Sequence, residues 1–98
     1  VYIVESPFNM LTLWKLGHPA ICIFGTGGGN QYSMLNKLPI RHYIIALDPD
    51  EAGKNGSRKL LHHLGKTKLL SKVNYLDSRD INDLDTEFDK LKISSINL

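Results

Sequence analysis

Three acidic residues stand directly after apolar runs of the sequence. Asp48 and Asp50 follow the run 42–47, and Glu5 follows the run 1–4. In an extended turn, positions i and i+2 point to the same side, so Asp48 and Asp50 can face one cation. Glu5 reaches the same place if the two runs are neighbouring strands. Three such carboxylates repel one another unless a divalent cation neutralises them, and oxygen ligands favour Mg²⁺. The pattern therefore predicts a metal site suited to phosphoryl transfer.

The same residues have a purely structural interpretation. Asp50 can cap the N-terminus of the helix that follows, and Glu51 can complement the dipole of that helix. Glu5 can be a solvated turn residue. On local grounds alone, both interpretations stay open.

Strands and helices must alternate to position these acids. The apolar pattern predicts strands over 1–4, 20–24 and 42–47 and a further strand-like segment that ends near residue 76. Such alternation implies βαβ units, hence an α/β fold with about four mainly parallel strands flanked by helices. The first and third strands are expected to be neighbours. Reactive groups then lie beyond the carboxyl ends of the strands, where Glu5 and Asp48 fall.

Turn and cap residues mark the expected helices. Ser6-Pro7 is a helix start, and Gly17 closes that first helix. Further helices are expected from about 30 to 38, after Gly53 to about residue 64, and after residue 80. The side chains expected to face the core are Met10, Leu13 and Trp14 in the first helix and Ala52, Gly56, Leu60 and Leu64 in the third.

The acidic motifs resemble a known family. Val4-Glu5 at a strand end, followed by Ile44-Ile-Ala-Leu-Asp-Pro-Asp-Glu-Ala-Gly53 leading into a helix, closely resembles the Toprim domain. Toprim domains occur in bacterial and phage primases, in type IA and II topoisomerases, in certain nucleases and in recombination mediators. The likeness covers roughly residues 1–84 and is greatest to DnaG-type primases and to phage or plasmid primase-helicases. The segment Arg79-Asp-Ile-Asn-Asp-Leu84 is similar to an acidic segment in those primases.

The resemblance implies the metal-binding catalytic centre of a DNA primase, a nucleotidyltransferase that makes RNA primers in DNA replication. Glu5 would be the general acid/base or a metal-proximal carboxylate, Asp48 and Asp50 would be the Mg²⁺ ligands with Mn²⁺ as a substitute, and Asp80 would be an additional acid. The implied partners are a DNA template, nucleoside triphosphates, other domains of a longer protein and a helicase. Primases usually have Gly directly after the Glu, whereas this chain has Ser6, which leaves the reach of Glu5 open.

Two alternatives stay open beside the primase. One is another Toprim enzyme, a nuclease or topoisomerase, that uses the same metals to cleave. The other is a non-catalytic Toprim module that binds DNA or partner proteins.

Phosphate contacts are expected around the acids. Lys54 and Arg58 share a helix face and are candidate contacts to nucleic-acid or nucleotide phosphates, or a solvated face. The glycine-rich loop 25–29 follows the second strand, and Thr26 and Gly27 are candidate phosphate contacts there, or part of a flexible loop.

Composition sets the remaining limits. Ninety-eight residues, 42% hydrophobic and 22% charged, suit one soluble domain (1–98, with its core in about 1–84), and the start on a strand without Met suggests a piece of a longer protein. The net charge of +2 does not by itself argue for nucleic acid. One cysteine, Cys22, inside an apolar run, is expected to be a buried hydrophobe rather than a nucleophile. No membrane span is expected, and a cytoplasmic setting fits.

Overall fold

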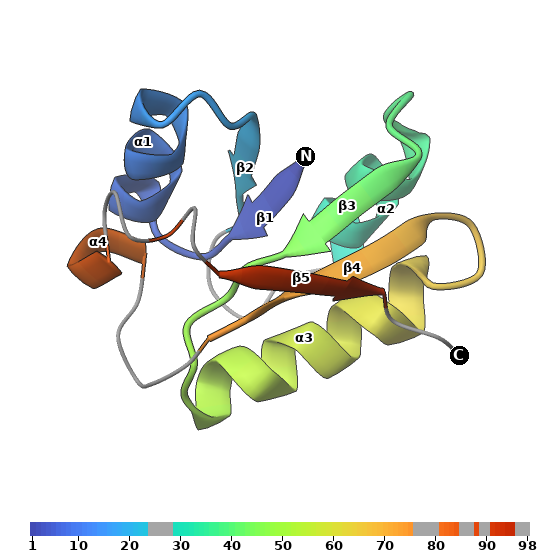
Figure 1. The fold of residues 1–98 in the computed structure, drawn as a ribbon. Helices are drawn as coiled ribbons and strands as arrows, with labels where there is room; N and C mark the ends of the chain where they lie inside the picture. The colour runs from blue at the N-terminus through green and yellow to red at the C-terminus, as the bar shows by residue number, and fades with distance from the viewer. Residues whose placement is uncertain (24–28, 76–80, 85–87, 89–90, 96–98) are drawn as a thin grey trace.

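One five-stranded sheet organises the chain, for which we describe a computed structural model. The structure describes residues 1–23, 29–75, 81–84, 88 and 91–95. The strands lie in the order β2-β1-β3-β4-β5 (Figure 1). In chain order the elements are β1 (Tyr2–Val4), α1 (Pro7–Lys15), β2 (Ala20–Cys22), α2 (Gly29–Lys37), β3 (His42–Ile45), α3 (Glu51–Leu64), β4 (Leu69–Asn74), α4 (Ile81–Leu84) and β5 (Lys92–Ser95).

The first four strands are parallel, as the α/β prediction requires. β1 pairs with β2 on one side and with β3 on the other, so the prediction that the first and third strands are adjacent is confirmed. β5 was not predicted. It pairs antiparallel with β4 at the edge of the sheet, and its short sequence, with Ile93 as the one large apolar side chain in the strand, has too little pattern to mark a strand.

Helices cover both faces of this sheet, and each face has its own core. Because side chains alternate along a strand, Ile3 of β1 faces one core while Tyr2 and Val4 face the other. The Ile3 core receives Leu35 from α2 and Leu60 and Leu64 from α3. The Val4 core receives Leu13 from α1 and Ile81 and Leu84 from α4. In Figure 1, α1 and α4 accordingly lie together, away from α3.

Helix α1 begins and ends at the predicted residues. The Ser6 hydroxyl accepts a hydrogen bond from the Phe8 N–H (3.2 Å), Pro7 is the first helical residue, and Gly17 has a φ of +88° after the last turn. Leu13 is fully buried as expected. Trp14 was wrongly predicted to lie in the core: it is 52% exposed, and its indole N–H donates to the carbonyl of Ala20 (3.2 Å).

In the described part of the chain, no helix is long and apolar enough to cross a bilayer.

Candidate functional site

Glu5 and Asp48 meet at the carboxyl edge of the sheet. In the parallel β1–β3 pair, Ile3 lies opposite Ile45, so the residues that follow both strands leave the sheet side by side. The Asp48 N–H donates a hydrogen bond to Oε1 of Glu5 at 2.9 Å. Glu5 therefore reaches the Asp48 turn although Ser6, rather than Gly, follows it.

The carboxylate of Asp48 accepts a hydrogen bond from a residue of α1, which packs on the face of the sheet opposite α3. Nδ2 of Asn9, in α1, donates to Oδ1 of Asp48 at 3.2 Å. Asn9 is 1% exposed, and its own Oδ1 is buried without a hydrogen-bond partner among the described residues. An unsatisfied buried acceptor costs about 1–3 kcal/mol, so this amide is retained at an energetic disadvantage. Asn9 was not predicted as a site residue, although its position one turn before Leu13, which was expected to face the core, was a signal.

Asp50 is the N-cap of α3. Its backbone is extended (φ −123°, ψ 178°), and its Oδ1 accepts the Gly53 N–H at 2.7 Å. Glu51 lies in the first turn, where a negative charge complements the helix dipole. The capping interpretation of Asp50 is therefore confirmed. A carboxylate has two oxygens with several lone pairs, so the cap does not use up its capacity to bind a cation.

Gly53 allows α3 to approach the end of β3. A Cβ at this position would stand 1.9 Å from the Asp48 carbonyl oxygen, which is a backbone atom that side-chain rotation cannot move. Gly53 is buried, whereas Ala52, which the sequence analysis placed in the core, is exposed. The inward position at the start of α3 thus belongs to the glycine, one residue later than predicted, because only a residue without a side chain fits there.

The acids fit a hard divalent cation by chemistry, although their side chains are not gathered in one cluster. Carboxylate oxygens are the ligands that Mg²⁺ prefers. Glu5, Asp48 and Asp50 all lie at the edge where β1 and β3 end, as predicted. Across the described ranges, however, no three His, Cys, Asp or Glu side chains are arranged to hold a metal. Each of the three carboxylates accepts a hydrogen bond from an N–H group.

The charge of Glu5 also affects its neighbour on β2. Burial, and secondly the negative charge of Glu5, raise the pKa of the Cys22 thiol above its ordinary value. A raised pKa disfavours the thiolate, which is the nucleophilic form. Cys22 is half-buried rather than buried as expected, and its role stays a prediction.

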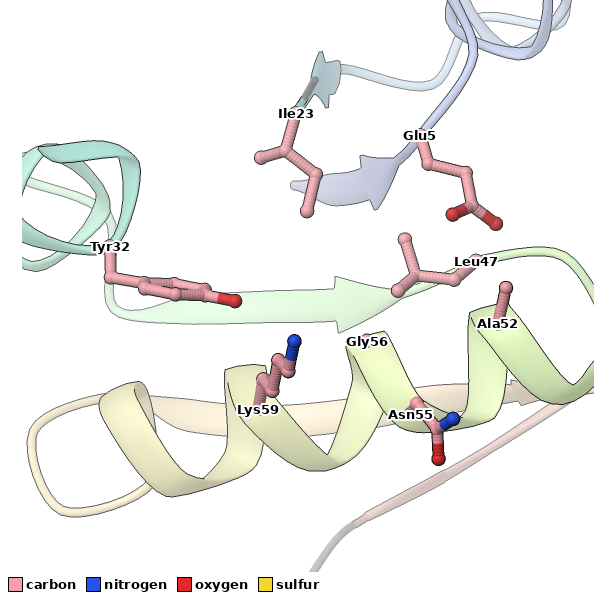
Figure 2. A pocket seen from close by; sticks show the side chains of 8 residues that line it. All are labelled: Glu5, Ile23, Tyr32, Leu47, Ala52, Asn55, Gly56 and Lys59. Carbon is pink, nitrogen blue, oxygen red and sulfur yellow. The ribbon is translucent and has the colours of Figure 1, made fainter. Parts of the chain in front are cut away.

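Two pockets flank α3 at the same edge. The first, about 460 Å³, is lined by Glu5, Ile23, Tyr32, Leu47, Ala52, Asn55, Gly56 and Lys59. In Figure 2, Glu5 stands over Leu47 and Ala52 at one end of this pocket, while Tyr32 from α2 and Lys59 from α3 enter at the other. The second pocket, about 450 Å³, lies between α3 and the strands β3 and β4 and contains Asp48.

The predicted phosphate contacts are placed in part. Lys54 and Arg58 both line the second pocket, together with Asp48. Thr26, Gly27 and Asp80 lie outside the residues that the structure describes, so their roles stay predictions.

Comparison with known proteins agrees with this architecture. The family model described as Toprim-like matches residues 2–86. The "Uncharacterized protein MG010" of Mycoplasma genitalium is 33% identical over 88 residues; the match covers 86% of this chain and 40% of that protein, so the chain spans less than half the length of that curated relative. The crystal structure of the Aquifex aeolicus primase, comprising its zinc-binding and RNA polymerase domains, matches with a TM-score of 0.75 and 19% identity over 95% of this chain and 26% of that one. At that identity the likeness is one of fold.

Proposed function

The chain belongs to the Toprim-like family, as its motifs indicated, and from this we propose that it is the metal-binding catalytic module of a DNA primase. The supporting observation is the 2.9 Å hydrogen bond between Glu5 and the Asp48 N–H. It keeps the glutamate beside the Asp48-Pro49-Asp50 turn, at the edge of the sheet where α/β proteins bind ligands. The fold likeness to a primase agrees with the proposal.

Each acid has a role in this proposal. Asp48 and Asp50 hold Mg²⁺, with Glu5 as a further ligand or as the base that accepts a proton from the attacking hydroxyl. When bound, the cation would neutralise phosphate charge and stabilise the attacking and leaving oxygens of nucleotidyl transfer. Asn9 orients Asp48 through the 3.2 Å hydrogen bond to its Oδ1. The nucleoside triphosphates, the DNA template and a helicase are partners of the whole protein, and the isolated chain is expected to make no primers.

Mn²⁺ titration by calorimetry at neutral pH tests the metal site. The informative variants are Asp48→Asn and Asp50→Asn. Asn caps a helix about as well as Asp, so Asp50→Asn keeps α3 capped and removes only charge and ligand strength. We expect saturable binding by the unmodified chain and a loss of affinity of about tenfold or more in both variants.

Glu51→Gln is the matched control. Glu51 is exposed, adjoins Asp50 in sequence and contributes the same charge to the region, but it belongs to none of the three proposed ligand positions. Its substitution is expected to leave Mn²⁺ affinity nearly unchanged. Equal weakening by Glu51→Gln would mean that only general negative charge matters, and the site assignment would fail.

A non-catalytic Toprim module is the second candidate. The observation in its favour is that Asp50 is already explained as a helix cap and that the described carboxylates form no three-acid cluster. Absence of Mn²⁺ binding in the presence of nucleotide would favour this candidate. A Toprim nuclease or topoisomerase would bind Mn²⁺ in the same way, and DNA cleavage by the longer protein would distinguish it from a primase.

A further inference from the structure

Three cationic side chains line the pocket between α3 and β4. They are Lys54 and Arg58 from α3 and Lys72 from β4, in a pocket of about 450 Å³ that has Asp48 in its wall. Figure 1 shows α3 running alongside β4 on this side of the sheet. The overall charge of the chain is only +2, so this grouping is a local feature rather than a consequence of a basic protein.

Both walls present their cations to the same space for geometric reasons. Lys54 and Arg58 are four residues apart and therefore lie on one face of α3. Lys72 lies on the same face of β4 as Leu70, which belongs to the core that contains Leu60 and Leu64 of α3. Lys72 is therefore on the α3 side of the sheet. Lys72 also pairs in register with Ile45 of β3, a residue of the same core and of the pocket wall.

These charges are poorly neutralised within the described residues. Lys54 has one ion pair, with Glu51 at 3.9 Å, and both side chains are mostly exposed (61% and 82%), so the pair contributes little. Arg58 donates to the uncharged Asn55 at 2.7 Å. No acidic partner of Lys72 occurs among the residues that the structure describes. Among the described lining residues, three cations thus face one carboxylate, that of Asp48.

We propose that this pocket binds the triphosphate group of a nucleoside triphosphate. Cations on two facing walls suit a compact polyanion between them, whereas the backbone of a nucleic-acid strand needs cations spread along a surface. The volume is that of a small-molecule site. The inference rests on the proposed function, since Asp48 in the wall would bring the triphosphate next to the metal-binding edge. Lys72, which was not predicted as a phosphate contact, thus joins the predicted contacts Lys54 and Arg58.

The test is titration of the 98-residue chain with inorganic tripolyphosphate in EDTA, followed by calorimetry and by amide chemical shifts. We expect binding that weakens as salt rises, and a loss of affinity of about three- to fivefold in each of Lys54→Gln, Arg58→Gln and Lys72→Gln. ATP is expected to compete with tripolyphosphate at the same amides. Because no metal is present, failure of the metal site proposed above would not alter this result.

Lys59→Gln is the matched control, because Lys59 is an exposed cation of the same helix that lines the other pocket. It is expected to leave tripolyphosphate affinity nearly unchanged. Equal weakening by Lys59→Gln, or no weakening by the three pocket variants, would overturn the proposal. The proposal would also be overturned if the three pocket variants weakened the binding of a short single-stranded oligonucleotide but not the binding of tripolyphosphate. That result would assign the pocket to nucleic acid.

Discussion

At the scale of single residues, the main finding is that the buried amide of Asn9 donates a hydrogen bond to the carboxylate of Asp48. Asn9 is 1% exposed, and it donates to Asp48 while its own Oδ1 has no hydrogen-bond partner among the described residues. Buried polar groups are normally satisfied. The unsatisfied oxygen of Asn9 lies next to the proposed metal ligand Asp48. This is expected of a positioning residue, because the amide is oriented to donate to Asp48 and not to satisfy its own oxygen.

Replacement of Asn9 separates positioning from folding. Asn9→Leu removes a charge-assisted hydrogen bond and also removes the orphaned oxygen, two effects of similar size and opposite sign. We expect the free energy of unfolding, measured with urea, to change by about 1 kcal/mol or less. Mn²⁺ affinity is expected to fall about tenfold, as for other groups that orient a metal ligand. Unchanged Mn²⁺ affinity in a folded variant would contradict the positioning role.

At the scale of elements, the contact between α3 and the end of β3 depends on Gly53. For Gly53→Ala, the gain in helix propensity is about 1 kcal/mol, but the new Cβ would lie 1.9 Å from the Asp48 carbonyl oxygen. The helix would have to move away from the strand that carries the site. We expect a net loss of about 2–3 kcal/mol in the free energy of unfolding, measured by urea denaturation.

Gly56→Ala in the same helix is the comparison. There the nearest atom to a new Cβ is Cδ1 of Leu47 at 2.8 Å, the end of a side chain that can rotate. Its stability is expected to stay within about 1 kcal/mol of the unmodified chain, because helix propensity and crowding offset each other. Equal destabilisation by both substitutions would show that the backbone contact at Asp48 is not the decisive one.

The elements also show where sequence reasoning succeeds. Strong local signals were sufficient for β1, β3 and α3, and the parallel order of β1 and β3 then brought Glu5 to Asp48 as predicted. What failed depends on contacts between distant segments. Gly53 is buried in place of Ala52 because α3 approaches Asp48 closely. Trp14 is exposed because of the way α1 lies on the sheet. The strand β5 forms because it pairs with β4. None of these contacts has a signature within its own segment.

At the scale of the whole molecule, the two cores are built without the proposed metal. The fully buried side chains on both faces of the sheet include Ile3, Leu13, Leu60 and Ile81, and the carboxylates lie at the edge, outside both clusters. Folding is therefore expected not to require a cation, in contrast to small domains whose metal replaces a core. A cation that binds the edge should stabilise the folded chain only by mass action.

The final prediction follows from this separation of core and site. In EDTA the chain is expected to remain folded, with an unchanged far-ultraviolet circular dichroism spectrum and a cooperative urea transition. Mn²⁺ at a hundred times its Kd should then raise the free energy of unfolding by about 2.7 kcal/mol, and Asp48→Asn should remove most of that increase. Unfolding in EDTA would mean that the metal is structural. Calorimetric binding without any gain in stability would mean that the unfolded chain binds Mn²⁺ as well, and that the edge of the folded sheet is not the site.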